Sequence, residues 1–267
     1  MLKSIRNNVR LFFDGALLSY IALFRWLRPS TYIASMVLGP LAYILFFVFL
    51  GRYATGASNA SFYVIGNAVQ MVAFSGIYGV TMSISGDRWD GTLPYLFGTP
   101  ANRLTLFFGR AFMHVINGAF TVVISLIWGV LLMGLDLSQA NLPALGVIIL
   151  VTAFSTCALG LLFGAVALMT RNVMFVNNTV FFLLLFFSGA NIAIDSLPAW
   201  MRTISLGLPL TRGIAAARQV VAGADLSDVT PLLLGEFGFG VIYIALGYAL
   251  FSWFEFQAKR RGTLEAV

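Results

Sequence analysis

Residues 142–169 read LPALGVIILVTAFSTCALGLLFGAVALM and contain no charged side chain. A helix needs roughly 20 apolar residues to cross the hydrocarbon core of a bilayer, which is about 30 Å thick. The run is continuously apolar and lacks the alternation that marks membrane β-strands, in segments of about ten residues. It therefore predicts a membrane-spanning helix.

Further largely uncharged runs lie on both sides of this one. The composition agrees with them, because 60% of the 267 residues are hydrophobic and 10% are charged, against about 25% charged in ordinary soluble domains. We therefore expect an all-α integral membrane protein with six transmembrane helices. The predicted spans are residues 31–50, 62–85, 104–133, 142–169, 173–190 and 232–254.

The sequence shows no internal repeat with a period of about 20 to 50 residues. We therefore expect residues 1–267 to form a single transmembrane domain. The first apolar run begins near Thr31 and is longer than a signal-peptide core of roughly 7 to 15 residues. That run is expected to remain in place as a helix.

The basic residues are distributed unevenly between the two sides of the predicted spans. The formal net charge is +6, but Lys and Arg flank apolar runs and do not cluster on a soluble face, so we expect no nucleic-acid partner. Cytoplasmic loops carry an excess of Lys and Arg. With both termini in the cytoplasm of a cell, and with a bacterial plasma membrane as the expected location, only Arg52, Arg202, Arg212 and Arg218 fall outside.

Residues 1–30 have the pattern of an interfacial helix. Ile5, Val9, Phe12 and Phe13 follow helical spacing on one face, and basic residues among them can meet anionic headgroups. A merely solvated basic leader is the alternative. We expect this segment to lie at the membrane surface before the first span.

Residues 191–231 are not polar enough for a free loop, and neither of their two parts is long enough to cross the membrane. Ser196 is expected to cap one short helix, and Thr211 a second helix that stops near Gly223. We expect both helices at the outer boundary, as short re-entrant elements that form a lid.

The chain lacks several kinds of chemical site. No G-x-x-x-x-G-K-[ST] loop is present, so it has no nucleotide site of the Walker type. His114 and Cys157 are its lone histidine and cysteine, so we expect no metal site.

His114 is expected to be a packing residue, and Arg110 and Glu236 are expected to snorkel near the ends of their spans. A carrier driven by an ion gradient usually needs ionisable groups at membrane depth, which these spans almost lack.

The connection between the second and third spans, residues 86–101, predicts a short helix with its own start and stop signals. Thr92 is a suitable N-cap, and Gly98 followed by Pro100 ends the pattern. Aromatic side chains on such a loop are suited to a partner's pocket, although a membrane-surface helix is the alternative. We expect the contact with the partner to involve Asp87, Arg88, Trp89, Asp90, Gly91, Thr92, Leu93, Pro94 and Tyr95.

This segment resembles the intracellular coupling region of type 2 ATP-binding-cassette (ABC) exporter permeases. Gly91-Thr92-Leu93 and Thr99-Pro100 match the family pattern, whereas Pro94 replaces its usual Glu. A second resemblance follows the fifth span, where Leu208 replaces the usual Asn. Its matching residues are Phe187-Ser188-Gly189, Leu197-Pro198-Ala199-Trp200 and Pro209-Leu210-Thr211.

The resemblance implies a transport subunit that is not itself an enzyme. Such a permease dimerises, with itself or with a related permease, and docks on two separate ABC ATPase subunits. It binds no cofactor of its own, since ATP and Mg are held by the ATPases. The expected cargo is an amphiphilic drug, a lipid or a lipid-linked glycan, moved outward by alternating access. A secondary transporter and a non-transporting membrane enzyme or assembly factor are the alternatives.

Small and polar residues within the spans suggest further contacts. Gly160 and Gly164 have the spacing that lets helix backbones approach closely, either in a dimer or within the chain. Asn67, Gln70 and Asn178, like Asn117 and Asn177, must find hydrogen-bond partners or line a wet cavity. Asn67, Gln70 and Asn178 are candidates for the substrate path, with interhelical packing as the alternative.

Overall fold

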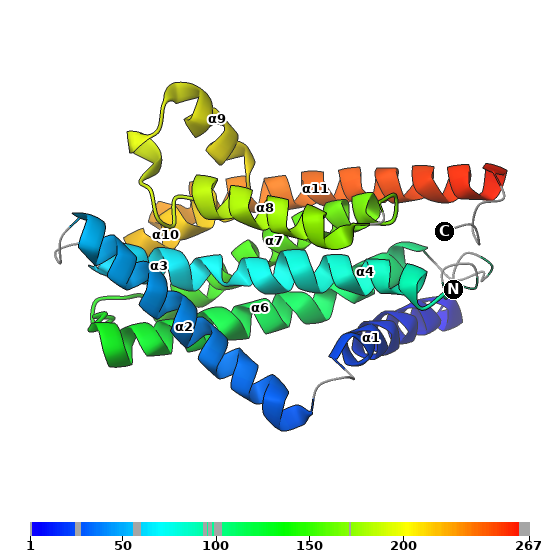
Figure 1. The fold of residues 1–267 in the computed structure, drawn as a ribbon, viewed down its shortest axis with the longest axis horizontal. Helices are drawn as coiled ribbons and strands as arrows, with labels where there is room; N and C mark the ends of the chain where they lie inside the picture. The colour runs from blue at the N-terminus through cyan, green and yellow to red at the C-terminus, as the bar shows by residue number, and fades with distance from the viewer. Residues whose placement is uncertain are drawn as a thin grey trace.

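A computed structural model describes residues 2–24, 28–55, 60–92, 95, 98, 103–170 and 172–261. The regular structure of these residues is helical and includes no strand (Figure 1), which confirms the all-α prediction. The elements are α1 (Leu2–Phe24), α2 (Pro29–Thr55), α3 (Ala60–Gln70), the π-helical segment η2 (Phe74–Gly79), α4 (Val80–Trp89), α6 (Arg103–Met133), α7 (Leu142–Ala167), α8 (Val173–Phe187), the 3-10 turn η3 (Ile194–Ser196), α9 (Ala199–Gly207), α10 (Thr211–Val221) and α11 (Leu226–Arg261).

Among the described residues, 5 helical segments are long and apolar enough to cross a membrane. They are Pro29–Thr55, Ala60–Gly86, Phe108–Met133, Leu142–Ala167 and Leu226–Gln257. Each overlaps one of the predicted spans. The second is a single apolar unit in which α3, η2 and α4 follow one another.

The predicted span 173–190 is shorter in the structure. Helix α8 has 15 residues, which at about 1.5 Å per residue gives roughly 22 Å, less than the hydrocarbon core. The side chain of Asn172 caps its start by accepting a hydrogen bond from the Phe175 backbone N–H, over 3.0 Å. Gly189 has a φ of +83°, which turns the chain after Phe187 and ends the helix. A sixth crossing therefore stays a prediction.

The long helices form a bundle in which α2, the α3–α4 segment, α6, α7, α8 and α11 run in alternating directions (Figure 1). The Ala60–Gly86 segment and α7 lie at its centre, since 78% and 67% of their apolar windows are buried, against 17% for α2 and 22% for α11. The start of α1 and the end of α11 lie at one end of the bundle, and α9 lies at the opposite end (Figure 1). Both ends of the described chain thus lie at one end of the bundle, and the side of the membrane that this end faces stays a prediction.

Glycines on α7 bring its backbone against the second predicted span. A Cβ atom on Gly160 would lie 1.9 Å from the backbone oxygen of Gly76 in η2. A Cβ on Gly164 would lie 2.4 Å from the side chain of Ile84 in α4. Of the two uses that the glycine spacing allows, these contacts show packing within the chain.

Helices α9 and α10, which are predicted to lie at the outer boundary, do not begin as predicted. Ser196 ends η3 and donates its hydroxyl to the Ala193 backbone oxygen, while α9 starts at Ala199 after Pro198. The prediction that Ser196 caps this helix is therefore wrong, because the Leu197-Pro198 pair is extended. Helix α10 starts at Thr211, but the Thr211 side chain makes no cap.

Glu236 provides the contact at the start of α10. Its Oε1 accepts a hydrogen bond from the Leu210 backbone N–H over 2.8 Å and another from the Ser155 hydroxyl of α7. Leu210 has a φ of +77°, which a non-glycine residue rarely adopts. Glu236 is fully buried, so the expectation that it snorkels is wrong. The predicted end near Gly223 is confirmed, because α10 stops at Val221 and Gly223 has a φ of +101°.

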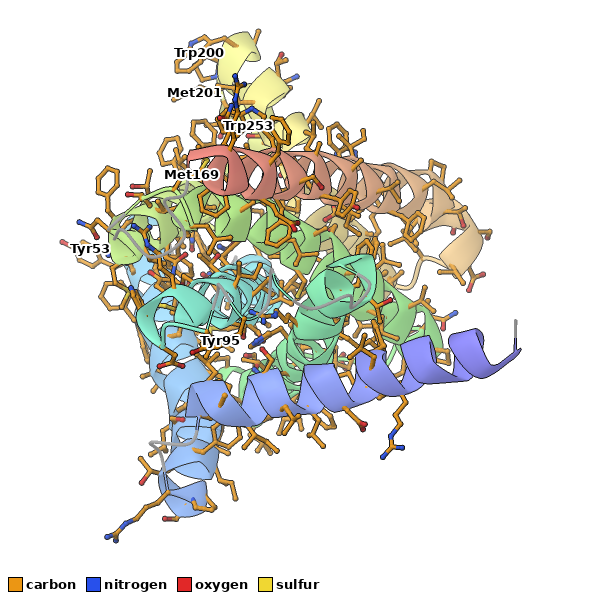
Figure 2. The ribbon with its side chains drawn as sticks, turned by 90° about the vertical axis from the view of Figure 1, so that its right-hand side faces the viewer. Tyr53, Tyr95, Met169, Trp200, Met201 and Trp253 are labelled. Atoms are coloured by element: carbon orange, nitrogen blue, oxygen red, sulfur yellow. The ribbon has the colours of Figure 1, made fainter. Side chains whose placement is uncertain are left out.

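Helix α1 lies across one end of the bundle (Figure 2). Phe12 and Phe13 contact Phe112 of α6, with ring centroids 5.3 and 5.7 Å apart. The helical state predicted for this segment is confirmed. Its position at a membrane surface stays a prediction that this orientation suits.

Candidate functional site

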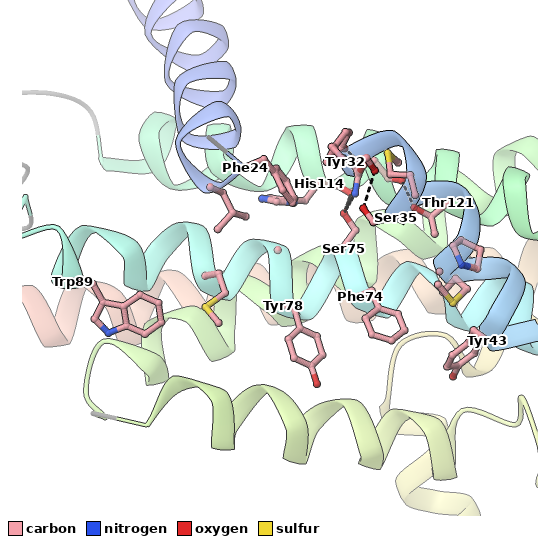
Figure 3. Close-up of a pocket in the computed structure, with 18 residues that line it drawn as sticks. Phe24, Tyr32, Ser35, Tyr43, Phe74, Ser75, Tyr78, Trp89, His114 and Thr121 are labelled. Carbon is pink, nitrogen blue, oxygen red and sulfur yellow. Dashed lines mark hydrogen bonds between the residues drawn. The ribbon is translucent and has the colours of Figure 1, made fainter. Parts of the chain in front are cut away.

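A cavity of about 590 Å³ lies between α2 and the η2–α4 segment, with α6 and the end of α1 completing its wall (Figure 3). This volume lies in the range of roughly 300 to 1,000 Å³ that is usual for small-molecule sites. Within the described part of the chain, its lining includes no Asp, Glu, Lys or Arg. The lining residues are Leu23, Phe24, Tyr32, Ser35, Met36, Gly39, Pro40, Tyr43, Met71, Phe74, Ser75, Tyr78, Gly79, Met82, Trp89, His114, Asn117 and Thr121.

The π-helical segment η2 supplies Phe74, Ser75, Tyr78 and Gly79 to the cavity wall. A π-helix has wider turns than an α-helix, because its hydrogen bonds join residues i and i+5. Single π-helical turns occur often at functional sites. Ser75 points to α6, where it contacts Asn117, whereas Phe74 contacts Phe181 of α8 at a centroid distance of 4.6 Å. The segment therefore presents polar and aromatic side chains in different directions.

Aromatic rings form one side of the cavity. Phe74 lies edge-on to Tyr43 and stacked on Tyr78, each at a centroid distance of 5.8 Å. Figure 3 shows Tyr43, Phe74, Tyr78 and Trp89 along the same side of the α3–α4 segment. Flat, polarisable surfaces of this kind suit an aromatic or apolar ligand.

Asn117 of α6 organises the polar side of the cavity. Its Oδ1 accepts hydrogen bonds from the hydroxyls of Tyr20 and Tyr32, over 2.8 and 2.9 Å. Its Nδ2 donates to the Ser75 hydroxyl over 2.9 Å. Burial, assisted by the contact with Tyr32, raises the pKa of Tyr20, which keeps its hydroxyl protonated as a donor. The prediction that Asn117 needs a hydrogen-bond partner is confirmed.

His114 lies one helical turn from Asn117 and also lines the cavity. Its side chain is fully buried, and its Nε2 lies 2.8 Å from the Ser83 hydroxyl. The Tyr20 ring covers it, with centroids 5.4 Å apart. The expectation that His114 is a packing residue agrees with this burial.

The three residues predicted to line a substrate path are placed differently. Asn67 and Gln70 are fully buried in α3. Asn67 donates to Asn191, and Gln70 accepts from Ser188, over 2.9 and 2.8 Å. Asn178 accepts a hydrogen bond from the Tyr78 hydroxyl over 2.5 Å. None of the three belongs to the cavity lining, and their role in a substrate path stays a prediction.

The predicted partner contact lies at the end of α4. The helix continues through Asp87 to Trp89, Asp90 follows it, and Gly91 turns the chain with a φ of +67°. Arg88 donates to the backbone oxygens of Leu168 and Thr170, over 2.9 and 3.0 Å, which ties the end of α4 to the end of α7.

The rest of this segment presents aromatic and small polar groups. Trp89 and Tyr95 are 59% and 77% exposed, and Thr92 is exposed as well. Leu93 and Pro94 lie outside the described residues, as does most of the short helix predicted after Thr92. The exposed aromatic side chains suit contact with another protein.

Sequence reasoning did not identify Phe74, Ser75 and Tyr78 as wall residues of a cavity. The available signal was the group of small residues Ser75, Gly76 and Gly79 inside the second predicted span. Hydropathy alone treats this group as an ordinary part of an apolar run. The π-helical turn and the side-chain directions follow from contacts with α6 and α7, which lie far away in the sequence.

Two named proteins are similar to the chain over most of its length. It is 28% identical over 228 residues to the daunorubicin resistance ABC transporter permease protein DrrB1 of Streptomyces coeruleorubidus, covering 81% of this chain and 78% of that protein. It is also 28% identical over 253 residues to the probable doxorubicin resistance ABC transporter permease protein DrrC of Mycobacterium tuberculosis, covering 91% of each. Residues 16–221 match the ABC-2 type transporter family. This match spans more than half of the chain, which therefore belongs to the ABC-2 type transporter family as a type 2 ABC permease.

Proposed function

We propose that this chain is the permease subunit of an ATP-driven exporter that moves a drug-like amphiphile outward across a cell membrane. The observation that carries the proposal is the cavity of about 590 Å³ between α2 and the η2–α4 segment. It combines an aromatic side with a hydrogen-bonding side, as an amphiphilic ligand requires.

The chemistry of the cavity favours a drug-like amphiphile over a lipid or a lipid-linked glycan. Its described lining offers no cationic side chain for a phosphate group. The two similar proteins are named for resistance to daunorubicin and doxorubicin, which are drugs. A cargo with a flat apolar part and a polar part therefore suits this chain best.

The energy for transport comes, in this proposal, from separate ABC ATPase subunits. The chain has no Walker-type loop, so ATP and Mg are held by the partner. Arg88 joins the end of α4 to the end of α7, so a displacement imposed on the loop after α4 would reach both helices. Alternating access follows if this displacement moves the η2–α4 wall of the cavity.

We propose that the end of the bundle carrying Trp89 and Tyr95 faces the cytoplasm, with α1 at the membrane surface beside it. Both terminal helices lie at this end (Figure 1), in agreement with the distribution of Lys and Arg. Two copies of the chain, or this chain and a related permease, would pair in the membrane and carry two ATPases.

Reconstitution with a candidate ABC ATPase subunit tests this proposal. The chain and the ATPase are purified together in lipid nanodiscs, and ATP hydrolysis and complex formation are measured for the wild type and for Tyr95→Ala. Tyr53→Ala is the matched control, because Tyr53 is 92% exposed near the outer end of α2, away from the predicted ATPase contact. Trp89 is a less suitable probe, since it also lines the cavity.

The proposal requires that the wild type and Tyr53→Ala recruit the ATPase equally, while Tyr95→Ala weakens recruitment or stops stimulation of ATP hydrolysis. Loss of one exposed aromatic anchor in a protein interface costs about 1 to 2 kcal/mol or more. If Tyr53→Ala and Tyr95→Ala recruit the ATPase equally, the segment that carries Tyr95 is not the contact with the ATPase. Absence of any complex with the wild type would contradict the proposed function.

A further inference from the structure

We propose that the exported molecule contacts the indole ring of Trp89, and that this contact couples binding of the exported molecule to binding of the ATPase. The inference rests on the proposed function and names the residue through which the cavity and the predicted ATPase contact communicate. Within the described chain, Trp89 is the one cavity-lining residue that also belongs to that contact, which the sequence places at residues 87–95.

Trp89 continues the cavity face of the helix that carries Tyr78. Tyr78, Met82 and Trp89 all line the cavity and occupy positions i, i+4 and i+11, about one and three helical turns apart. The three side chains therefore lie on one side of the helix. Figure 3 shows Trp89 at one end of this row and Tyr43 beyond its other end. At about 1.5 Å per residue, Trp89 lies roughly 16 Å along the helix from Tyr78, so the row reaches the end of α4.

The Trp89 ring has surface left for a ligand. Trp89 is 59% exposed although it lines the cavity, whereas Ile84 on another face of the same helix is buried. Flat aromatic rings pack favourably on an indole, either offset-stacked or edge-on. A flat aromatic ligand in the cavity can therefore cover this ring and shield it from water.

The residues that follow Trp89 are held to the last turn of α4. The Asp90 backbone N–H donates to the Gly86 oxygen over 2.8 Å, and the Gly91 N–H donates to the Arg88 oxygen over 3.3 Å. Gly91 then turns the chain with a φ of +67°. Trp89 and the start of the predicted ATPase contact therefore move together.

Helix α7 limits the positions that the end of α4 can adopt. The Arg88 side chain donates to the backbone oxygens of Leu168 and Thr170. Because few positions are allowed, a ligand that covers Trp89 and an ATPase that binds the next residues can favour the same one. Two ligands that favour one position strengthen each other's binding by the same factor.

Equilibrium binding of the dye Nile red tests this inference. Nile red is a flat, uncharged aromatic molecule, and its own emission is followed, so that substitution of a tryptophan does not change the signal. Its dissociation constant for the chain in lipid nanodiscs is measured without the candidate ABC ATPase and with a saturating concentration of it, in the absence of ATP. Empty nanodiscs are subtracted to remove partition into lipid. The ratio of the two dissociation constants is the coupling factor.

Three variants separate the aromatic contact from other effects. Trp89→Leu removes the flat ring and keeps an apolar side chain. Trp89→Phe keeps a flat ring and is the conservative replacement. Trp200→Leu is the matched control, because Trp200 is 62% exposed in α9, at the opposite end of the bundle (Figures 1 and 2).

The wild type is expected to show a coupling factor of about 5 or more, the lower limit that is usual for linked sites. Without the ATPase, Trp89→Leu should bind Nile red about 3- to 10-fold more weakly than the wild type, the range of one aromatic contact. Its coupling factor should fall to about 1. Trp89→Phe should keep most of both quantities, and Trp200→Leu should match the wild type.

Unchanged binding of Nile red to Trp89→Leu without the ATPase overturns the inference, and this measurement decides even if that variant no longer joins the ATPase. A wild-type coupling factor of about 1 also overturns it, as do equal losses in Trp200→Leu. In these cases a wild-type complex with the ATPase leaves the proposed function standing. Absence of that complex overturns both the inference and the proposed function.

Discussion

Asn117 joins four elements through a single side-chain amide. From its position in α6, it contacts Tyr20 of α1, Tyr32 of α2 and Ser75 of η2. Hydrogen bonds between membrane helices contribute only about 0.6 kcal/mol on average, but several groups lose their partner together when this amide is removed. The residue therefore has a larger structural role than one average hydrogen bond.

We expect Asn117→Leu to destabilise the protein by roughly 1 to 3 kcal/mol, because it removes the acceptor shared by the Tyr20 and Tyr32 hydroxyls, which then have only each other as partners, and the donor to Ser75. Thermal unfolding in nanodiscs measures the loss. Ser35→Ala is the control, since the exposed Ser35 hydroxyl contacts only the Tyr32 backbone oxygen and its removal should change stability by less than about 0.5 kcal/mol. Equal unfolding temperatures for both variants would contradict this role for Asn117.

For single residues, the sequence showed which buried side chains require a hydrogen-bond partner, but not which group provides it. It predicted that hydrogen-bond partners in the protein or a wet cavity accommodate Asn67, Gln70, Asn117, Asn177 and Asn178. All but Asn177 have partners, whereas the buried Asn177 side chain has none among the described residues. The same reasoning placed Glu236 at the membrane boundary, whereas the carboxylate is buried against Ser155 and Leu210. Hydropathy reports the cost of burying a polar group, but the partner that offsets this cost comes from the tertiary fold.

At the scale of elements, the approach of α7 to η2 depends on Gly160. A Cβ atom there would lie 1.9 Å from a backbone oxygen, which cannot move aside as a flexible side chain can. We expect Gly160→Ala to cost about 1 to 3 kcal/mol of stability through overpacking. Gly146→Ala on the same helix is the control, because nothing lies within 4 Å of its Cβ position. An equally stable Gly160→Ala protein would contradict the observed packing.

The start of α10 depends on Glu236. We expect Glu236→Ala to loosen α10, because the Leu210 backbone N–H and the Ser155 hydroxyl both lose their acceptor. Hydrogen–deuterium exchange should be faster in residues 210–221 and unchanged in the centre of α7. Asp228→Ala, at an exposed position near the start of α11, should leave exchange in α10 as it is. Unchanged protection of α10 in Glu236→Ala would show that the helix is held in another way.

The predicted elements are helices, as in the structure, but the residues at which they end are predicted less accurately. Uninterrupted apolar runs located α2, α6, α7 and α11, because length and hydropathy alone decide whether a helix crosses a bilayer. The same information could not locate the π-helical turn at Phe74–Gly79. It also made the fifth span too long, since the turn at Gly189 is a matter of backbone conformation.

At the scale of the whole molecule, the sequence predicted an export permease that needs a separate source of energy. The family match agrees with the permease assignment. The cavity could not be predicted, because its wall combines α1, α2, η2, α4 and α6. Side chains that are distant in the sequence meet only once these helices pack.

The most direct measurement of the central claim is ATP-driven transport in inverted membrane vesicles that contain the chain and its ABC ATPase. The cargo is a drug-like aromatic amphiphile, and its accumulation is followed with ATP, with a non-hydrolysable ATP analogue and with a protonophore. An ATP-driven exporter should accumulate the cargo only with hydrolysable ATP and should continue when the proton gradient is dissipated. Accumulation that ignores ATP and collapses with the proton gradient would contradict the account.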